Sequence, residues 1–319
     1  MTQSRRSNER GTAQERLAAK RAAAAAAKAQ AARRKRMLMI LAPVVVVIVV
    51  LGVFFGVYYG TKGGSKKPSA NTTPTGTSAT GTSAPTGGSL AGPGADAAML
   101  AKVVNVSASV LDQVGAGTTS GGLQPADGDP VTGPSGKPLV LYVGAEFCPF
   151  CAGERWPVVV ALSRFGTFTG LGETTSSSTD TYPDTATLSF HGSSYTSAYI
   201  DFTGIESSDR EQKPLDTISP SDQAIFQKYS PKGYIPLAVF GNQFYSGGAS
   251  FDPGVLQGKT QAQIADALSD PTSAIAQAID GSANMLTAAI CKMTDGQPAA
   301  VCQSAGVQAG AAKLPQKAS

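Results

Sequence analysis

Histidine is almost absent from this chain, and cysteine and tryptophan are rare. His191 is the single histidine among 319 residues. Metal sites built from several histidines are therefore excluded, as is any Ser/His or Cys/His nucleophile pair that does not include His191. We expect His191 to be a strand or surface residue. We expect Trp156, the one tryptophan, to pack in the core.

Acidic residues are scarce at the N-terminus, where the positive charge is concentrated. Residues 1–36 contain eleven Lys or Arg and two Glu, a net charge of +9, so residues 37–319 carry −5 of the total of +4. The basicity therefore belongs to the tail, and a nucleic-acid partner for the rest of the chain loses its main electrostatic argument. We interpret 1–36 as a basic cytoplasmic tail attracted to anionic lipid headgroups.

Residues 37–59 lack any charged side chain. Twenty-three residues in a helix span about 35 Å, enough for a bilayer core. Four basic residues, Arg33 to Arg36, precede this run directly. The positive-inside rule then predicts a single-pass transmembrane helix, a signal anchor of the cell membrane, with its N-terminus in the cytoplasm and the C-terminal domain outside. A cleaved signal peptide is the alternative, although the apolar run is long for one.

Large side chains are nearly missing from residues 60–95, which are mostly Gly, Ser, Thr, Pro and Ala. This composition predicts a flexible linker. The pattern downstream predicts a helix over 96–114, a buried strand over 138–144, a helix over 151–166, a loop over 167–186 and a pair of strands at 187–191 and 198–203. It further predicts a helix over 220–229 capped by Ser219, strands at 235–240 and 243–245, and helices through most of 261–305.

The four cysteines form one close pair and one looser pair. Cys148 and Cys151 lie between the predicted strand and helix, in the run Cys148-Pro149-Phe150-Cys151. This order places Cys148 at a helix N-terminus, where unpaired N–H groups and the helix dipole stabilise a thiolate. Cys148 is then the attacking thiol, and Cys151 resolves the mixed disulfide. Pro149 suits the first helical turn.

These residues resemble the thioredoxin superfamily. Ala145-Glu146-Phe147-Cys148 is similar to the entry of thioredoxins, and Cys-Pro-Phe-Cys resembles the motif of glutaredoxins. The resemblance implies a cis-proline facing the disulfide, which Pro236 matches, and a substrate groove formed by Tyr234, Ile235, Pro236, Pro149 and Phe150. More narrowly, residues 147–165 resemble membrane-anchored, thioredoxin-like proteins of bacteria and archaea whose function is largely unassigned. The implied fold is α/β and thioredoxin-like, a central mixed sheet flanked by helices, over residues 96–280.

Two side chains that influence the reactive thiols in this superfamily are replaced in this chain. Tyr142 stands where thioredoxins have a buried acid, and Phe150 stands where envelope oxidases often have histidine. Nearby charges would act on the thiols in opposite directions if close. Glu146 and Glu154 would raise the thiol pKa, and Arg155 would lower it.

Cys291 and Cys302 flank a turn in a predicted C-terminal helical hairpin over residues 281–312. We expect a structural disulfide, with a second redox pair as the alternative. A zinc site made of all four cysteines has poor spacing, so we expect no metal and no cofactor.

The resulting hypothesis is a membrane-anchored, extracytoplasmic thiol–disulfide oxidoreductase that oxidises, isomerises or reduces protein disulfides. Its expected partners are extracytoplasmic protein thiols and disulfides, a membrane or extracytoplasmic redox protein, and the lipid bilayer through residues 37–59. The alternatives are a non-catalytic binding or assembly module with the same fold and a soft-metal chaperone.

Overall fold

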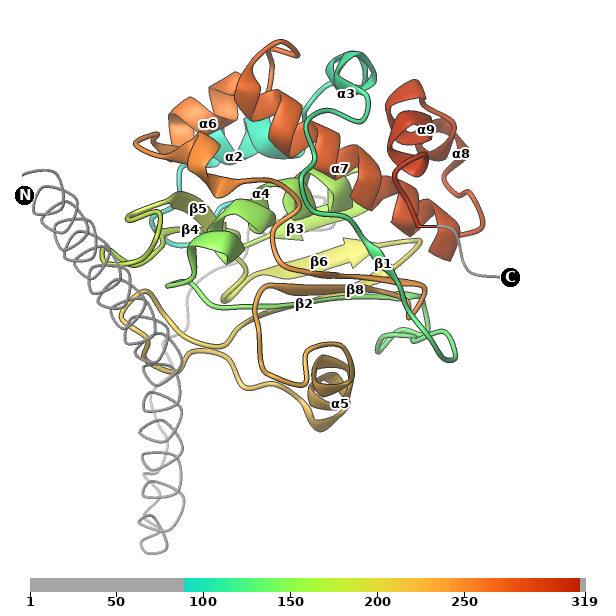
Figure 1. The fold of residues 1–319 in the computed structure, drawn as a ribbon, viewed down its shortest axis with the longest axis horizontal. Coiled ribbons are helices and arrows are strands. Elements are labelled where there is room, and N and C mark those ends of the chain that lie inside the picture. Colours follow the sequence, from blue (N-terminus) through green and yellow to red (C-terminus); the bar gives the residue numbers. More distant parts are fainter. Residues whose placement is uncertain (1–88, 316–319) are drawn as a thin grey trace, which may run out of the picture. The chain divides into compact units, whose positions relative to one another are not determined.

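The computed structural model describes residues 89–315, so the predicted tail (1–36), the predicted membrane helix (37–59) and most of the predicted linker lie outside the described residues. The elements alternate between helices and short strands (Figure 1). In chain order they are α2 Ala97–Val104, α3 Ala108–Val114, β1 Gln124–Pro125, β2 Leu139–Gly144, α4 Pro149–Leu162, β3 Gly166–Thr169, β4 Gly172–Thr175, β5 Ala186–Ser189, β6 Ser194–Ser197, β7 Asp201–Glu206, α5 Pro220–Tyr229, β8 Leu237–Phe240, β9 Phe244–Gly247, the 3-10 helix η1 Pro253–Leu256, α6 Gln261–Ala267, α7 Ala274–Met293, α8 Ala299–Cys302 and α9 Ala305–Ala311.

A five-stranded mixed sheet forms the centre of the fold, in the order β1-β9-β8-β2-β7. β2 runs parallel to β7 and antiparallel to β8, and β8 runs antiparallel to β9. All residues of β2 are buried, as expected for a strand covered on both faces. The prediction of an α/β fold with a central mixed sheet flanked by helices is confirmed.

The two faces of β2 belong to different cores because side chains alternate along a strand. Val140 and Tyr142 join the larger core beneath α4 and α7, whereas Leu139, Leu141 and Val143 face the smaller core. The smaller core is covered by α5, which lies on the opposite side of the sheet from α4 and α7 (Figure 1). Helices therefore cover both faces of the strand that leads to the cysteine motif.

Helix α4 is buried along almost its whole length, with Phe150 as its one exposed residue. It begins with Pro149 in the first turn after the N-cap Cys148, as the sequence predicts. The long helix α7 packs directly against it. A helix that is apolar around most of its circumference needs such cover on several sides.

The predicted helix over 96–114 is two helices. α2 ends before Asn105, and Ser107 caps α3 by accepting a hydrogen bond from the N–H of Val110. The serine side chain offers the backbone an alternative to continuing the helix, so the chain turns there. Within residues 89–315 no single helix is long and apolar enough to span a bilayer; α2 and α3, bent by 59°, meet that test only as a pair, by length and composition.

The predicted loop over 167–186 contains two strands, β3 and β4. The predicted pairing of residues 187–191 with 198–203 is also wrong, because β5 pairs with β4, β6 pairs with β3, and β7 joins the central sheet beside β2. β3 and β4 are four residues long and rich in threonine and glycine, so they have no clear hydrophobic period. Gly170, with a φ of 72°, allows the turn between β3 and β4.

Both ends of the described chain are joined to the core. Ser89 and Leu90, predicted as linker, accept backbone hydrogen bonds from Gly170 and Leu171, so these two residues belong to the folded part. At the other end, a disulfide joins Cys291 of α7 to Cys302 of α8, with Cα atoms 5.6 Å apart. The predicted disulfide is confirmed.

Candidate functional site

The cysteine motif lies at the carboxyl end of β2, where the chain turns into α4. Cys148 is the N-cap residue of α4, and its Sγ accepts a hydrogen bond from the backbone N–H of Cys151 at 3.2 Å. The backbone N–H of Cys148 donates to the carbonyl of Ala145. The sulfur therefore takes the place of the oxygen that usually caps a helix, next to the positive end of the helix dipole.

Both thiols are free and buried, but they differ in environment. A hydrogen bond from the Cys151 side chain, with further ones from backbone N–H groups, lowers the pKa of the Cys148 thiol although burial opposes this. Burial, together with the neighbouring Cys148 sulfur, raises the pKa of the Cys151 thiol. Of the two thiols, Cys148 is therefore the more acidic, and a lower thiol pKa favours the thiolate form.

Of the predicted groove residues, Ile235 approaches Cys148 from the segment before β8, and Pro149 and Phe150 follow Cys148 in α4. The Ile235–Pro236 peptide bond is cis, and the carbonyl oxygen of Ile235 lies 3.9 Å from the Cys148 Sγ. Tyr234 and Phe150 are the exposed large hydrophobic side chains of the described residues, at 68% and 41% exposed. Both belong to segments that meet at Cys148, one before β8 and one at the start of α4.

Tyr182 adds a third aromatic ring, which the sequence did not indicate. It lies in the segment between β4 and β5, and its ring meets the Phe150 ring edge to face, with centroids 6.0 Å apart. Its hydroxyl donates to Asp252 at 2.8 Å. The Ser/Thr-rich segment predicted as a loop therefore contributes to the surface beside the motif.

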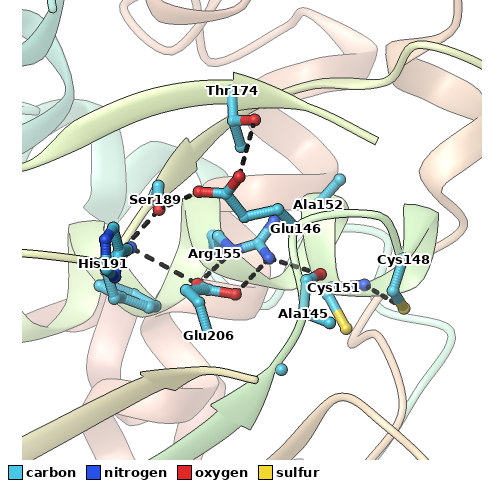
Figure 2. A network of polar contacts seen from close by, with 12 residues as sticks. Ala145, Glu146, Cys148, Cys151, Ala152, Arg155, Thr174, Ser189, His191 and Glu206 are labelled. Atoms are coloured by element: carbon cyan, nitrogen blue, oxygen red, sulfur yellow. Dashed lines mark hydrogen bonds and ion pairs between the residues drawn. The ribbon is translucent and has the colours of Figure 1, made fainter. Parts of the chain in front are cut away.

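A buried ion pair lies behind the motif (Figure 2). Arg155 donates from Nε and Nη2 to the two carboxylate oxygens of Glu206 at 2.7 and 2.6 Å, and from Nη2 to the carbonyl of Ala145 at 2.7 Å. Neither side chain of the pair is exposed to solvent. Glu206, at the end of β7, was missed by the sequence analysis because only the register of β7 against β2 brings it here.

Glu146 and Glu154 have partners of their own. Glu146 accepts hydrogen bonds from Ser189 and Thr174 (Figure 2). Glu154 accepts from the N–H and the hydroxyl of Ser250 at 2.7 and 2.6 Å. Burial raises the pKa of Glu154 to about 7, and the bonds from Ser250 oppose that rise.

Three other residues considered in the sequence analysis, Tyr142, Trp156 and His191, are described by their burial and hydrogen bonds. Tyr142 is buried, and its hydroxyl donates to the carbonyl of Cys151 at 3.3 Å. Trp156 is buried, and its Nε1 donates to the carbonyl of Ala186. His191 is exposed, with its ring 2.6 Å from Asp216. Among residues 89–315, no group of three or more His, Cys, Asp or Glu side chains could hold a metal ion.

Comparison with known proteins gives one match. The model of a family described as "Domain of unknown function (DUF929)" matches residues 131–243. That stretch contains the cysteine motif, the Arg155–Glu206 pair and the segment around Pro236. No curated protein and no solved structure matches the chain.

Proposed function

We propose that this protein is a thiol–disulfide oxidoreductase with a thioredoxin-like fold. The observation that carries the proposal is the asymmetry of the two thiols: the Cys148 Sγ caps α4 by accepting the N–H of Cys151, whereas Cys151 is fully buried one turn later. These positions lower the pKa of the Cys148 thiol and raise that of the Cys151 thiol. The element order supports the same fold: the motif strand, the motif helix, a parallel strand, a helix, and then two antiparallel strands of which the first follows Pro236.

The reaction follows from the two thiols. The Cys148 thiolate attacks one sulfur of a substrate disulfide, which forms a mixed disulfide and releases one substrate thiolate. Cys151 then loses its proton and attacks Cys148, so the second substrate sulfur leaves and the Cys148–Cys151 disulfide forms. The substrate gains two electrons and the motif loses them. The same steps in reverse oxidise a substrate dithiol, and an external redox protein restores the motif in either direction.

The exposed aromatic side chains support a polypeptide substrate with a bulky apolar residue beside its cysteine. Phe150, which meets the Tyr182 ring, lies two residues after Cys148, and Tyr234 precedes Ile235, whose carbonyl oxygen approaches the Cys148 Sγ. Burying such a ring contributes roughly 1.5–3 kcal/mol, because apolar area is removed from water. We expect Phe150→Ser with Tyr234→Ser to raise KM roughly tenfold and leave kcat nearly unchanged.

We also propose that the domain acts outside the cell membrane, anchored by residues 37–59. The uncharged run of 23 residues after a basic cluster supports this orientation. The Cys291–Cys302 disulfide supports it independently, because such bonds persist mainly in oxidising compartments.

The test uses the purified full-length chain in insulin-disulfide reduction and in oxidative refolding of a reduced protein. We expect turnover in at least one assay, abolished by Cys148→Ser. A folded wild-type chain that shows no Cys148-dependent turnover in either assay is a binding module, and the enzyme proposal fails. Tight, stoichiometric binding of a soft metal by the reduced chain, without turnover, would support the chaperone alternative instead.

A further inference from the structure

Arg155 lies on the same face of α4 as the two cysteines. It follows Cys148 by seven residues and Cys151 by four, and both spacings return to one stripe of a helix. Glu154, six residues after Cys148, is turned away from that residue, and its carboxyl is bound to Ser250 in the segment after β9. Of these two adjacent buried side chains, the basic one is therefore the one bonded beside the motif.

A shared carbonyl connects the guanidinium to the motif. The oxygen of Ala145 accepts a hydrogen bond from Arg155 Nη2 at 2.7 Å and another from the backbone N–H of Cys148 at 3.2 Å. In Figure 2, Ala145 lies between Arg155 and the two cysteines. Glu206 holds the guanidinium from the other side through two hydrogen bonds, so its position is fixed by three bonds.

The guanidinium of Arg155 has hydrogen-bonding capacity left over in this position. Its Nη1 is buried and has no hydrogen-bond acceptor among the described residues. Tyr142, beside it, supplies no charge, because burial raises the pKa of its hydroxyl well above the ordinary value. A buried cation with unused donors favours a further anion nearby, since charge interactions are stronger away from water.

We propose that Arg155, held in place by Glu206, is a positioning residue whose fixed positive charge stabilises the Cys148 thiolate and shifts the cysteine pair toward its reduced form. The proposal rests on the proposed function. It states that an ion pair sets the redox equilibrium of the two cysteines. The site has Tyr142 in place of a buried acid and Phe150 in place of a histidine, so neither of those groups can do so. Arg155 also lowers the pKa of both thiols, although it is not the largest influence on either.

A substrate dithiol loses two electrons and two protons and becomes a disulfide. The Cys148–Cys151 disulfide takes up both electrons, Cys151 binds one proton, and the other proton goes to solvent because Cys148 stays a thiolate. Since only the reduced form contains a thiolate, a charge that stabilises the thiolate makes the pair a stronger oxidant.

The experiment compares the full-length chain with four variants. Arg155→Met with Glu206→Gln removes the ion pair without leaving one charge buried alone. Glu206→Gln alone keeps the positive charge of Arg155. Arg155→Lys keeps a positive charge but removes the bidentate hydrogen bonding to Glu206. Glu154→Gln is the matched control, a buried carboxyl on the same helix. Near-ultraviolet circular dichroism verifies folding. The pH dependence of Cys148 alkylation then gives its thiol pKa, and equilibration with glutathione gives the redox equilibrium constant.

We expect the double variant to bind the Cys148 proton roughly tenfold more tightly and to shift the glutathione equilibrium roughly tenfold toward the disulfide, a potential about 30 mV more negative. Arg155→Lys should lie between it and wild type, and Glu206→Gln and Glu154→Gln should not raise the thiol pKa. A folded double variant with an unchanged thiol pKa overturns the inference, as does an equal rise in Glu206→Gln. Both readouts are independent of turnover, so failure of the enzyme proposal is detected separately.

Discussion

Asp280 gives the folded domain a specific dependence of stability on pH. It lies within α7, is fully buried, and neither of its carboxylate oxygens has a hydrogen-bond partner among the described residues. Burial raises its pKa from the ordinary 3.8 to about 8. The folded protein therefore keeps this carboxyl protonated at neutral pH, because an unpaired charge would be costly there.

The sign follows from proton binding in the two states. Below about pH 4 both states are protonated, and the group costs no free energy of unfolding. Between about pH 4 and 8 the unfolded chain releases the proton while the folded chain retains it, so stability falls as pH rises. Each pH unit in that window costs up to about 1.4 kcal/mol, so the loss at pH 7 is at most about 4 kcal/mol. Above pH 8 the loss is constant.

Asp280→Asn should remove this loss, because asparagine has a similar shape and no charge. We expect the variant to match wild type near pH 4 and to exceed its free energy of unfolding by roughly 2–4 kcal/mol at pH 7. Urea unfolding of the full-length chain, followed by the fluorescence of the single tryptophan, Trp156, measures this difference. Glu211→Gln, a change at an exposed acid, is the control and should shift stability little at either pH. If Asp280→Asn and wild type differ equally at both pH values, the carboxyl is ionised in the fold and the reasoning is refuted.

Three further outcomes follow from the described contacts. Cys151→Ser should accumulate a mixed disulfide with substrate, visible by non-reducing electrophoresis, because the attacking thiol of Cys148 remains and the resolving thiol is gone; recovery of no adduct would contradict the assigned roles. Replacing Cys291 and Cys302 by serine should lower the free energy of unfolding by about 3 kcal/mol and leave the thiol pKa of Cys148 unchanged; a shifted thiol pKa would indicate a redox relay instead. Glu154→Gln should flatten the loss of stability between pH 5 and 7, because the raised pKa of about 7 is removed; an unchanged slope in urea titrations would count against a protonated Glu154.

Local patterns were sufficient for the elements that hold the motif. The apolar run before Cys148 became β2, the proline after it started α4, and Ser219 capped α5 as expected. Each depends on residues adjacent in the sequence, such as a cap or a continuous buried strand. The positions of both cysteines and of Pro236 could therefore be assigned to a common site from the sequence and the resemblance.

The other strands and two residues of the site depend on pairing between strands that are distant in the sequence. β3 pairs with β6 and β4 with β5, and nothing local in these four short, polar-rich strands selects those partners. Glu206 and Tyr182 join the site only through such pairings: Glu206 by the parallel register with Gly144, and Tyr182 by the turn between β4 and β5. Without knowing which strands pair, the sequence alone does not predict that Glu206 or Tyr182 lies near the motif.

The roles of Glu154 and Arg155 show where helix periodicity alone could have gone further. Both were expected to act on the thiols if close, with opposite signs. On a helix of 3.6 residues per turn, a residue seven after Cys148 returns to its face, whereas a residue six after it is turned well away. The structure follows this rule, since Arg155 bonds to Ala145 beside the motif and Glu154 bonds to Ser250. The same helix thus directs these two adjacent buried side chains to different partners, as the proposed role of Arg155 beside Cys148 requires.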